Sequence, residues 1–339
     1  MPTALFNHFP IVISHRLTDV VAQLRHEGQA SIDTGIPMNS SPTVFDTYQQ
    51  FDDIIGRAHE KRILSIAAAG HHHLLLIGPP GIGKTLLANS VIHLLPDLSE
   101  HAALEAYARA ETTEKDPQLS CRPPLRAPHH SLTAAGMIGG GVPLLMGEVT
   151  RAHNGVLLLD ELFEFRRNTL DALREPLVEN VVRLTRAGRT ATLPARFLLA
   201  ATANPCPCGM RGYGECRCLD SEVRRYWARC SGPLMDRIEL VVHMDKQTIN
   251  PMDPSNDAVR VEQLRQQVKM ARDILRQADI HLNPVADKFV HQLQGRFSMS
   301  QRAIAHLNSI SGTIAALDER DVIEKRDVEE AMSLRVGRH

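Results

Sequence analysis

Residues 74–85 read LLLIGPPGIGKT and have the pattern of a phosphate-binding loop set between a strand and a helix. Gly78, Gly83, Lys84 and Thr85 satisfy the motif G-x-x-x-x-G-K-[ST], and four aliphatic residues suited to a buried parallel strand precede the loop. The residues that follow, LLANSVIHLL, have helical spacing. Strand, glycine-rich loop and helix are the context that this motif requires, so the stretch predicts an α/β fold with a nucleotide site. A glycine turn that exposes a lysine is the alternative.

Several positions of this loop have a physical reason to contact a nucleotide. Gly81 and Gly83 allow backbone N–H groups to turn toward phosphate oxygens, and the following helix directs its positive end to the same anion. Lys84 supplies a positive charge to the β- and γ-phosphates, and Thr85 supplies a hydroxyl to Mg²⁺. We therefore expect ATP and Mg²⁺ as cofactors, held by Gly78, Pro79, Gly81, Ile82, Gly83, Lys84, Thr85 and Asp160.

A second apolar stretch ends in two acidic residues. Residues 156–161 read VLLLDE, in which four aliphatic residues predict a buried strand. Asp160 and Glu161 lie at its carboxyl end, where ligands bind in an α/β sheet. Asp160 is expected to support Mg²⁺ through its water ligands, and Glu161 to polarise the attacking water as general base. A strand capped by two solvated acids is the alternative, which the phosphate-binding loop disfavours.

A third apolar strand precedes an asparagine. Residues 197–203 read FLLAATA and are followed by Asn204. An amide at this position can orient the attacking water opposite the γ-phosphate, so we predict that Asn204 is catalytic together with Glu161. The alternative is an asparagine in a turn before Pro205, which is a common arrangement.

The order of these motifs resembles that of AAA+ ATPases, which have a Walker-type loop, a strand ending in Asp–Glu and a strand ending in Asn. More specific stretches resemble the ComM/YifB branch of the magnesium-chelatase-related AAA+ ATPases, and the resemblance covers about residues 45–335. These stretches are FDDIIGRAHEKRILSIAAAGHHHLLLIGPPGIGKT (51–85), RAPHHSLTAAGMIGGG (126–141), GEVTRAHNGVLLLDEL (147–162), NPCPCG (204–209) and SGPLMDRIEL (231–240). The resemblance implies a homo-oligomeric ring, usually hexameric. In the competence members it implies an ATP-driven DNA translocase that extends heteroduplex joints during transformation.

The resemblance also implies a fold class and a domain organisation. We expect an α/β, AAA+ P-loop NTPase domain over residues 51–250, with a parallel sheet sandwiched by helices, a helix-2 insert and a β-hairpin insert. A small α-helical lid domain is expected over residues 255–339. Residues 1–28 resemble only the tail of the Lon-protease-like N-terminal domain that family members usually carry, and the polar residues 29–50 are typical of a linker. The chain is then a shortened homologue or a fragment of a split reading frame.

Two arginines match positions with a role in the family. Arg237 occupies the position of the arginine finger, a guanidinium that reaches the γ-phosphate of a neighbouring subunit. Residues 298–301, SMSQ, fit the capping box S-x-x-Q and predict a helix that begins near Met299. Arg302 then lies in its first turns, where the family has its second sensor arginine, and whether it acts within its own subunit is open. An amphipathic helix is predicted over residues 258–279.

A basic hairpin is predicted before the third strand. In residues 181–193, VVRLTRAGRTATL, apolar and polar residues alternate around an Ala–Gly pair. The family places such a hairpin facing the central pore. Residues 183–237 contain ten arginines, no lysine and four acids, a local charge of +6 in a chain of net charge −1. This charge suits phosphate binding, with solvated arginines and subunit salt bridges as the alternative. We expect DNA to contact Arg183, Arg186 and Arg189.

Four of the six cysteines lie within residues 204–218, NPCPCGMRGYGECRC. Two C-x-C pairs bridged by a glycine-containing turn predict a loop that wraps one Zn²⁺ tetrahedrally through Cys206, Cys208, Cys216 and Cys218. The common zinc pattern is C-x-x-C, so four reduced thiols in a flexible loop are a close alternative. A redox role ranks third, because C-x-C lacks the βαβ setting of thiol oxidoreductases.

Length and composition limit the number of domains, the location and the partners that the sequence allows. The 339 residues suffice for two domains, and no run of about eighteen apolar residues occurs, so we expect no membrane span or membrane partner. The N-terminus lacks the pattern of a secretory signal, which predicts a cytoplasmic protein with reduced thiols. The net charge of −1 excludes a global attraction to nucleic acid. His71, His72 and His73 are expected to form a surface loop that enters the first strand.

The combined expectation is an enzyme: an Mg²⁺-dependent ATPase and DNA helicase or translocase that acts in natural transformation or recombination. Two alternatives stay open. One is a motor that drives metal insertion into a tetrapyrrole, as the chelatase relatives do, and the cysteine loop disfavours it. The other is a non-catalytic subunit that only binds nucleotide or partners, which the intact set of candidate catalytic residues disfavours.

Overall fold

The computed structural model describes residues 54, 57–111, 119–141, 145–186, 189–245 and 260–335. The segments expected as a domain remnant (1–28) and a linker (29–50) lie outside the described residues. Ser99–Cys121 belongs to a compact unit of its own, in which Glu100–Glu111 form helix α5. The other described elements belong to a second unit, which contains the sheet and the C-terminal helices.

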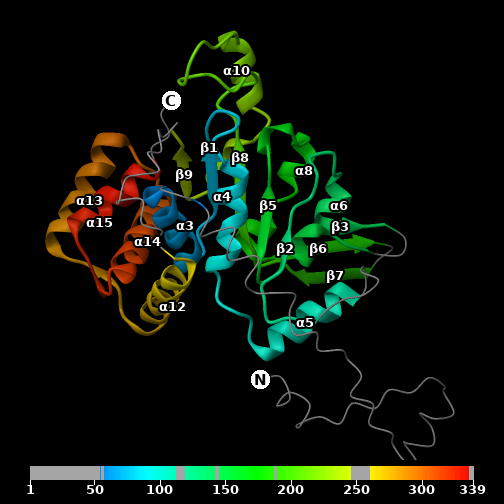
Figure 1. Cartoon of the computed structure of the whole chain (residues 1–339), viewed down its shortest axis with the longest axis horizontal. Coiled ribbons are helices and arrows are strands. Elements are labelled where there is room, and N and C mark those ends of the chain that lie inside the picture. Colours follow the sequence, from blue (N-terminus) through cyan, green and yellow to red (C-terminus); the bar gives the residue numbers. More distant parts are fainter. Residues whose placement is uncertain are drawn as a thin grey trace, which may run out of the picture. The chain divides into compact units, whose positions relative to one another are not determined.

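Five parallel strands form the central sheet of the second unit (Figure 1). Their order across the sheet is β2 (Leu125–Arg126), β5 (Val156–Leu159), β8 (Leu198–Ala203), β1 (Leu74–Ile77) and β9 (Leu240–His243). Neighbouring strands are parallel throughout. The three strands expected from the apolar stretches are therefore adjacent, and their carboxyl ends lie along one edge of the sheet.

The three central strands β5, β8 and β1 are buried at every position, and all their residues except Thr202 are apolar. All four residues of β1 are buried, and they alternate between two hydrophobic cores. Leu74 and Leu76 belong to the core on one face, and Leu75 and Ile77 to the core on the other. This alternation follows from the two-residue period of a strand.

Helices cover both faces of the sheet. The first core includes residues of α3 (Ala58–Gly70), of α4 (Lys84–Ser90) and of the 3₁₀ helix η1 (Val91–Leu94). The second core is built with short helices, which are α6 (Ala134–Ile138), α7 (Glu148–Arg151), the 3₁₀ helix η2 (Leu162–Glu164), α8 (Arg167–Asp171), α10 (Asp220–Trp227) and α11 (Gly232–Met235). The expected α/β sandwich with a parallel sheet is confirmed.

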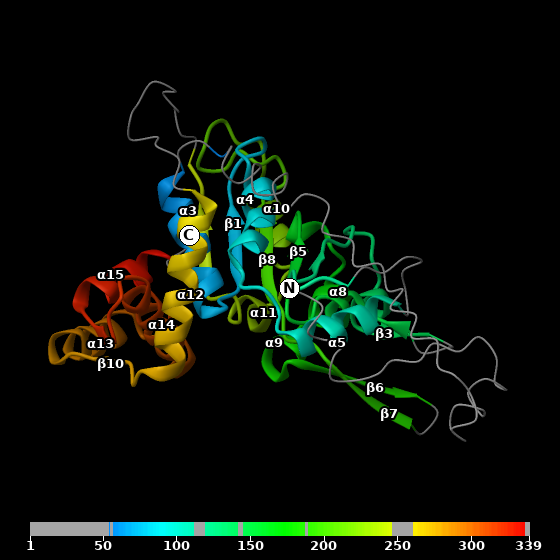
Figure 2. The ribbon, with the colours of Figure 1, turned by 60° about the horizontal axis from the view of Figure 1, so that its bottom comes forward.

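Two small antiparallel ribbons accompany the sheet. One pairs β3 (Gly139–Gly140) with β4 (Leu145–Met146). The other is a hairpin of β6 (Val181–Arg186) and β7 (Arg189–Pro194), which follows α9 (Pro176–Glu179). Figure 2 shows this hairpin extending away from the central sheet. The alternating sequence thus predicted the hairpin correctly.

The C-terminal region is a helical lid built from α12 (Val261–Gln277), α13 (Pro284–Phe297), α14 (Gln301–Leu317) and α15 (Lys325–Ser333). The two-residue strands β10 (His281–Leu282) and β11 (Val322–Ile323) pair within it. Helices α12 and α14 contact α3, and apolar residues of the lid share one core with the sheet (Figure 1). Arg62 on α3 adds ion pairs to Glu330 (2.6 Å) and Asp318 (3.3 Å).

The outer edge of β9 is covered by the end of the lid. The backbone N–H of Val241 donates a hydrogen bond of 2.8 Å to the carbonyl of Leu334, which follows α15. This contact satisfies a backbone group on a strand that, in the described part of the chain, forms the edge of the sheet.

The helix start expected near Met299 is wrong by two residues, because α14 begins at Gln301. Ser298 ends α13 in a left-handed conformation (φ 48°), and Ser300 caps α14 by accepting a hydrogen bond of 3.2 Å from Ala303 N. Both serines precede the same helix in sequence, but only Ser300 has the extended backbone of an N-cap. Arg302 still lies in the first turn of α14, as expected.

The interpretation of the three histidines as a surface loop is also wrong. His72 is 3% exposed, and its Nε2 lies 2.8 Å from the Thr313 hydroxyl of α14. His73 Nδ1 accepts a hydrogen bond of 3.1 Å from Leu199 N of β8. Burial lowers the pKa of both imidazoles to about 3, so both are neutral at physiological pH.

In the part of the chain that the structure describes, no helix combines the length and the apolar content needed to cross a membrane.

Candidate functional site

The carboxyl ends of β5, β8 and β1 bring the three sequence motifs together. Ile77 on β1 pairs in register with Ala203 on β8, and Leu159 on β5 pairs with Ala201. The backbone N–H of Gly78 continues the ladder, with a hydrogen bond of 3.2 Å to the carbonyl of Ala203. The phosphate-binding loop, the Asp–Glu pair and Asn204 therefore leave the sheet at neighbouring points.

The phosphate-binding loop has the backbone that its glycines were expected to provide. Gly81 and Gly83 have φ angles of 80° and 87°, in the region that side chains other than glycine disfavour. Gly83 is the N-cap residue of α4, so the loop passes directly into the helix. The backbone N–H groups at the start of α4 lack a side-chain cap and are available to an anion.

Lys84 points back into the loop and toward β8. Its ammonium group donates hydrogen bonds to the carbonyls of Gly78 (2.8 Å) and Pro79 (2.9 Å). A third bond of 3.0 Å goes to Oδ1 of Asn204. Burial lowers the pKa of Lys84, and the charges of Asp160 and Glu161 act in the opposite direction. The lysine and asparagine that the sequence assigned to one site are thus in direct contact.

Asp160 accepts hydrogen bonds from two hydroxyl groups on different elements. Oδ1 lies 2.9 Å from the Thr85 hydroxyl on α4 and 2.5 Å from the Thr202 hydroxyl on β8. A hydroxyl and a carboxylate in contact, beside a phosphate-binding loop, are oxygen donors of the kind that Mg²⁺ prefers. The two residues expected to hold the metal therefore form one oxygen-lined corner.

Glu161 has an unusual backbone conformation at the end of β5. Its φ and ψ angles are 54° and 55°, a left-handed conformation that costs a residue other than glycine about 1–2 kcal/mol. The Glu161 N–H donates a hydrogen bond of 3.0 Å to the Thr202 hydroxyl, which helps to hold this conformation. Strain of this kind is typical of functional sites, where the surrounding structure over-determines one residue.

Sequence reasoning missed Thr202. Its hydroxyl contacts both acidic residues of the site, yet in FLLAATAN it looks like part of an apolar strand. The available signal was the two-residue period of a strand, which puts Thr202 on the same face as Asn204.

Arg237 and Arg302 lie near each other and outside this cluster. Burial, followed by the charges of Arg302 and Arg174, lowers the pKa of Arg237. Arg237 Nη1 donates to the carbonyl of Pro233, and its buried Nε has no hydrogen-bond partner among the residues that the structure describes. Within the described residues, no hydrogen bond or ion pair joins Arg237 or Arg302 to the phosphate-binding loop of the same chain. Sequence reasoning did not single out Arg174, the third arginine of this group.

The four clustered cysteines converge in a loop of residues 205–219, here named the cysteine loop. Cys206 Sγ lies 3.4 Å from Cys208 Sγ, and each of these atoms lies 3.7 Å from Cys216 Sγ. With Cys218, all four sulfur atoms lie within 4.8 Å of one another. A tetrahedron of sulfur atoms around one ion with Zn–S bonds of about 2.3 Å has edges of about 3.8 Å. The observed spacing therefore suits a single four-coordinate metal ion.

The thiols of the cysteine loop differ in their tendency to ionise. Backbone N–H groups of Met210 and Arg217 lower the pKa of Cys208 to about 6. Although the backbone N–H of Cys208 acts in the opposite direction, burial and the neighbouring thiols raise the pKa of Cys218 to about 12. One thiolate thus disfavours another at this spacing, and a bound divalent cation is what allows several to ionise together.

The structure describes the side chain of only one of the three hairpin arginines, Arg183. Arg183 makes an ion pair of 2.7 Å with Glu175, and Glu179 lies 3.7 Å away. Both partners are exposed, so solvent screens the pair and it adds little to stability. Arg186 and Arg189 face each other at the end of the hairpin ladder. Their side chains lie outside the described residues.

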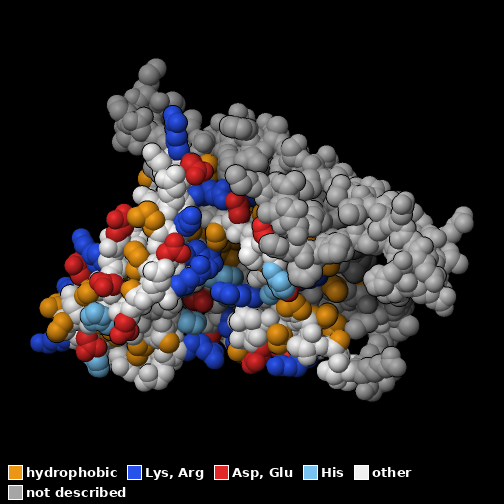
Figure 3. Space-filling view, turned by 90° about the horizontal axis from the view of Figure 1, so that it is seen from below, with side chains coloured by type: hydrophobic (Ala, Val, Ile, Leu, Met, Phe, Trp, Pro, Cys, Tyr) orange, Lys and Arg blue, Asp and Glu red, His pale blue; other side chains and the backbone are white. Residues whose placement is uncertain are grey.

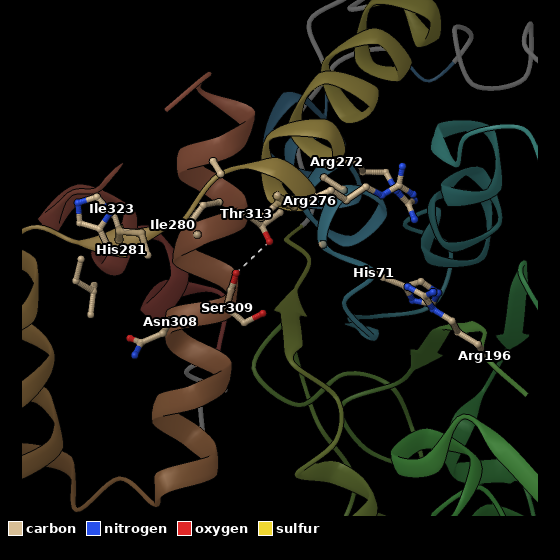
Figure 4. A pocket seen from close by; sticks show the side chains of 16 residues that line it. His71, Arg196, Arg272, Arg276, Ile280, His281, Asn308, Ser309, Thr313 and Ile323 are labelled. Atoms are coloured by element: carbon tan, nitrogen blue, oxygen red, sulfur yellow. Dashed lines mark hydrogen bonds between the residues drawn. The ribbon is translucent and has the colours of Figure 1, made fainter. Parts of the chain in front are cut away.

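A separate pocket of about 630 Å³ lies at the opposite edge of the sheet, between the amino ends of the strands and the lid. His71 and Arg196 line it from the sheet side, and Arg272 and Arg276 line it from α12 (Figure 4). Figure 3 shows basic side chains gathered on the face seen from below. Burial, with the charges of Arg276 and Arg196, lowers the pKa of Arg272 to about 10. The pocket shares no residue with the phosphate-binding loop and belongs to a different region of the molecule.

The fold and this arrangement define the class of protein. A phosphate-binding loop after β1, an Asp–Glu pair after β5 and an asparagine after β8, with a helical lid behind the sheet, are the features of an AAA+ P-loop NTPase. Sequence comparison gives the family. The profile described as "Magnesium chelatase, subunit ChlI" matches residues 50–252, and the profile "Magnesium chelatase, subunit ChlI C-terminal" matches residues 253–335. The chain therefore belongs to the magnesium chelatase subunit ChlI family, which confirms the resemblance seen in the motifs.

Individual relatives cover most of the chain. YifB of Escherichia coli K12 is 36% identical over 98% of this chain and 68% of its own length. The competence protein ComM of Haemophilus influenzae is 34% identical over 94% of this chain and 66% of its own length. A Mycobacterium tuberculosis H37Rv protein is 40% identical over 70% of this chain and 48% of its own length. The chain thus spans about half to two thirds of the length of these relatives.

Replacing Thr202 by valine tests its role in holding the two acidic residues. The change keeps the shape of the side chain but removes the hydroxyl that bonds to Asp160 and Glu161. We expect the free energy of unfolding to fall by about 1–3 kcal/mol, because the Asp160 carboxylate and the partly buried N–H of Glu161 both lose a hydrogen-bond partner. Urea denaturation, monitored by circular dichroism, measures the free energy of unfolding. Thr192→Val, at an exposed hairpin position, is the control and should stay within about 0.5 kcal/mol of the parent. Equal stability of the two variants would show that the Thr202 hydroxyl does not stabilise the two acidic residues.

Proposed function

We propose that the chain is an Mg²⁺-dependent ATPase whose hydrolysis site lies at the carboxyl edge of the sheet. One observation carries the proposal: Lys84, Thr85, Asp160 and Asn204 are joined by direct hydrogen bonds across three adjacent elements. A cation, a pair of oxygen groups suited to Mg²⁺ and an amide in mutual contact support a proposed position of the γ-phosphate among them.

Each residue of the site has a distinct task in this proposal. Lys84 exchanges its bonds to Gly78, Pro79 and Asn204 for bonds to phosphate oxygens. Asn204, once released, turns its amide to the attacking water, and Glu161 accepts a proton from that water. Thr85 and Asp160 hold Mg²⁺, which when bound neutralises the charge that develops on the phosphate oxygens.

We propose further that the protein acts as a homo-oligomeric ring, with six subunits as in its AAA+ relatives. Arg237 supports this proposal, because its buried Nε lacks a partner and its nearest charged neighbours include two other arginines. An anion supplied by an adjacent subunit would satisfy this group. Arg302, on the first turn of α14, is assigned to the same interface. The tasks of both residues are then completed by the nucleotide of a neighbour.

DNA is the substrate that the charge distribution favours for such a motor. The segment from Arg183 to Arg237 has a net charge of +6, and the hairpin that begins it extends away from the sheet (Figure 2). A relative that is named a competence protein supports a role in the uptake or recombination of DNA. We therefore propose ATP-driven DNA translocation during natural transformation or recombination. Because Arg183 is paired with Glu175, Arg186 and Arg189 are the principal DNA contacts proposed.

The family description favours one second function, in which ATP hydrolysis drives metal insertion into a tetrapyrrole. Stimulation of ATP turnover by DNA distinguishes the two, because a chelatase motor has no reason to respond to a nucleic acid. The cysteine loop has a proposed task of its own in either case. Its four sulfur atoms have the spacing of a single tetrahedral ion, and we assign one structural Zn²⁺ to them.

Two substitutions separate nucleotide binding from hydrolysis. Lys84→Ala should abolish ATP binding, because the phosphates lose their charge partner. Glu161→Gln should retain binding and lower turnover by about 10²-fold or more, because only the general base is removed. Isothermal calorimetry measures binding and phosphate release measures turnover. Lys269→Ala, an exposed lysine of α12, is the control and should leave both unchanged. An equal loss of binding in the two site variants would contradict the assigned roles.

Substitution of the proposed arginine finger tests the ring. Arg237→Ala should lower turnover by about 10³-fold or more, because the transition state loses a positive charge, while each subunit still binds ATP. In rings mixed with parent subunits, activity should fall faster than the fraction of variant, because each variant also disables its neighbour's site. Arg296→Ala, an exposed arginine of α13, is the control. A loss strictly proportional to the variant fraction, with subunit exchange verified, would argue for action within one subunit.

The hairpin variant tests the DNA proposal. Replacing Arg186 and Arg189 by alanine should weaken DNA binding about equally for unrelated sequences, because a translocase grips phosphates rather than bases. The salt dependence of the binding constant should fall by about 0.7–0.9 for each lost contact. Fluorescence anisotropy at several salt concentrations measures both.

The matched control for the hairpin removes the same number of charges from the lid, through Lys288→Ala and Arg296→Ala on α13. Its affinity for DNA should match that of the parent, and basal ATP turnover should persist in both variants. Unchanged affinity and salt dependence in the hairpin variant would exclude the hairpin as the contact. A parent protein without affinity for DNA at low salt would overturn the DNA proposal itself and favour metal insertion.

A further inference from the structure

The cysteine loop lies directly against the phosphate-binding loop. Gly209, in the left-handed region with a φ of 77°, sits so close to Pro80 that an added Cβ would lie 2.7 Å from the Pro80 Cδ atom. The same Cβ would lie 3.9 Å from Cγ of Asn204. Figures 1 and 2 both show the loop that precedes α10 beside the loop between β1 and α4. One residue of the cysteine loop therefore packs against the phosphate-binding loop at a point close to Asn204.

The position of Gly209 depends on the sulfur cluster. Its N–H donates a hydrogen bond of 2.9 Å to the carbonyl of Cys206, so Gly209 closes the turn that carries Cys206 and Cys208. The Arg211 N–H then donates to Cys206 Sγ at 3.4 Å. Cys206 also follows Asn204 by only two residues, so the backbone connects the cluster directly to Asn204. Movement of the cluster would move both Gly209 and Asn204.

The cysteine loop has almost no apolar core to hold this arrangement. Within residues 205–219, only Pro205, Cys206 and Gly209 are buried. The remaining residues are half-buried or exposed, with one exposed ion pair of 2.8 Å between Arg211 and Asp220. A short segment with so little buried apolar surface requires a cross-link to stay in one conformation.

We propose that the metal held by the four cysteines fixes the nucleotide site, so that metal occupancy sets the affinity for nucleotide. The metal orders the turn at Cys206 and Cys208, and the turn presses Gly209 on Pro80 and positions Asn204 beside Lys84. This inference rests on the proposed ATP site and on the proposed zinc ion. When the loop is disordered, only a fraction of the molecules has a competent site, and the apparent affinity falls by that fraction.

The test compares metal content with nucleotide affinity in the full chain purified under reducing conditions without chelators. Elemental analysis for zinc and iron gives the metal, because a tetrahedral S₄ site suits both. Calorimetry gives the dissociation constant of ADP, which requires no turnover. We expect one Zn²⁺ per parent chain, and none in Cys208→Ser combined with Cys216→Ser. The ADP dissociation constant of this variant should rise about tenfold, which corresponds to about one molecule in ten with a competent site. Cys121→Ser, at an exposed cysteine outside the loop, is the control and should match the parent.

Two further variants separate the steps of the proposal. Gly209→Ala keeps all four cysteines and should keep the zinc, yet it should weaken ADP binding because its Cβ collides with Pro80. This variant also decides the question if the double cysteine variant fails to fold. Lys84→Ala should lose ADP and keep the zinc, which separates the nucleotide site from the metal site.

The possible failures are distinguishable. A parent chain without metal would overturn the zinc proposal and this inference with it. Zinc that is lost from the double variant while ADP affinity stays unchanged would overturn the inference alone, as would Gly209→Ala with zinc and full affinity. A parent chain with zinc but without ADP binding would instead overturn the proposed ATPase.

Discussion

The parallel register of β5, β8 and β1 is the constraint on which the candidate site depends. Because these strands lie side by side in this order, Asp160, Asn204 and the phosphate-binding loop emerge at one edge of the sheet. Thr202 converts this proximity into fixed geometry, since its hydroxyl bonds to the Asp160 carboxylate and to the Glu161 backbone. A slip of β8 by one residue would turn Thr202 to the opposite face and break both bonds.

Residues whose role follows from a short sequence motif could be predicted from the sequence. The glycine-rich loop, the acidic pair, the hairpin and the four convergent cysteines are of this kind, and so is the α/β class of the fold. Residues whose role comes from neighbours in space could not. His72 follows a pattern typical of a surface loop, and it is buried because Thr313 of a distant helix supplies its hydrogen-bond partner. Ser298 and Ser300 are equivalent as sequence signals, and only the end of α13 distinguishes them.

The basic residues proposed for the site differ in whether they have hydrogen-bond partners within the same chain. Lys84 finds its partners inside the same chain, in two carbonyls and the Asn204 amide. Arg237 has a buried nitrogen without a hydrogen-bond partner among the described residues, and two other arginines lie near it, an arrangement that costs free energy in an isolated chain. In the proposed ring, a group from a neighbouring subunit would supply the missing partner.

The contact between the lid and the sheet has a consequence for synthesis of the chain. Helix α3 precedes the first strand, but its apolar surface is covered by α12 and α14, and the outer edge of β9 is covered by Leu334. The ribosome synthesises the lid last. Until then, the nascent chain exposes the apolar surface of α3 and the unpaired edge of β9. Chains released before the lid is made expose the surface that chaperones and proteases recognise. The cell can therefore remove incomplete chains.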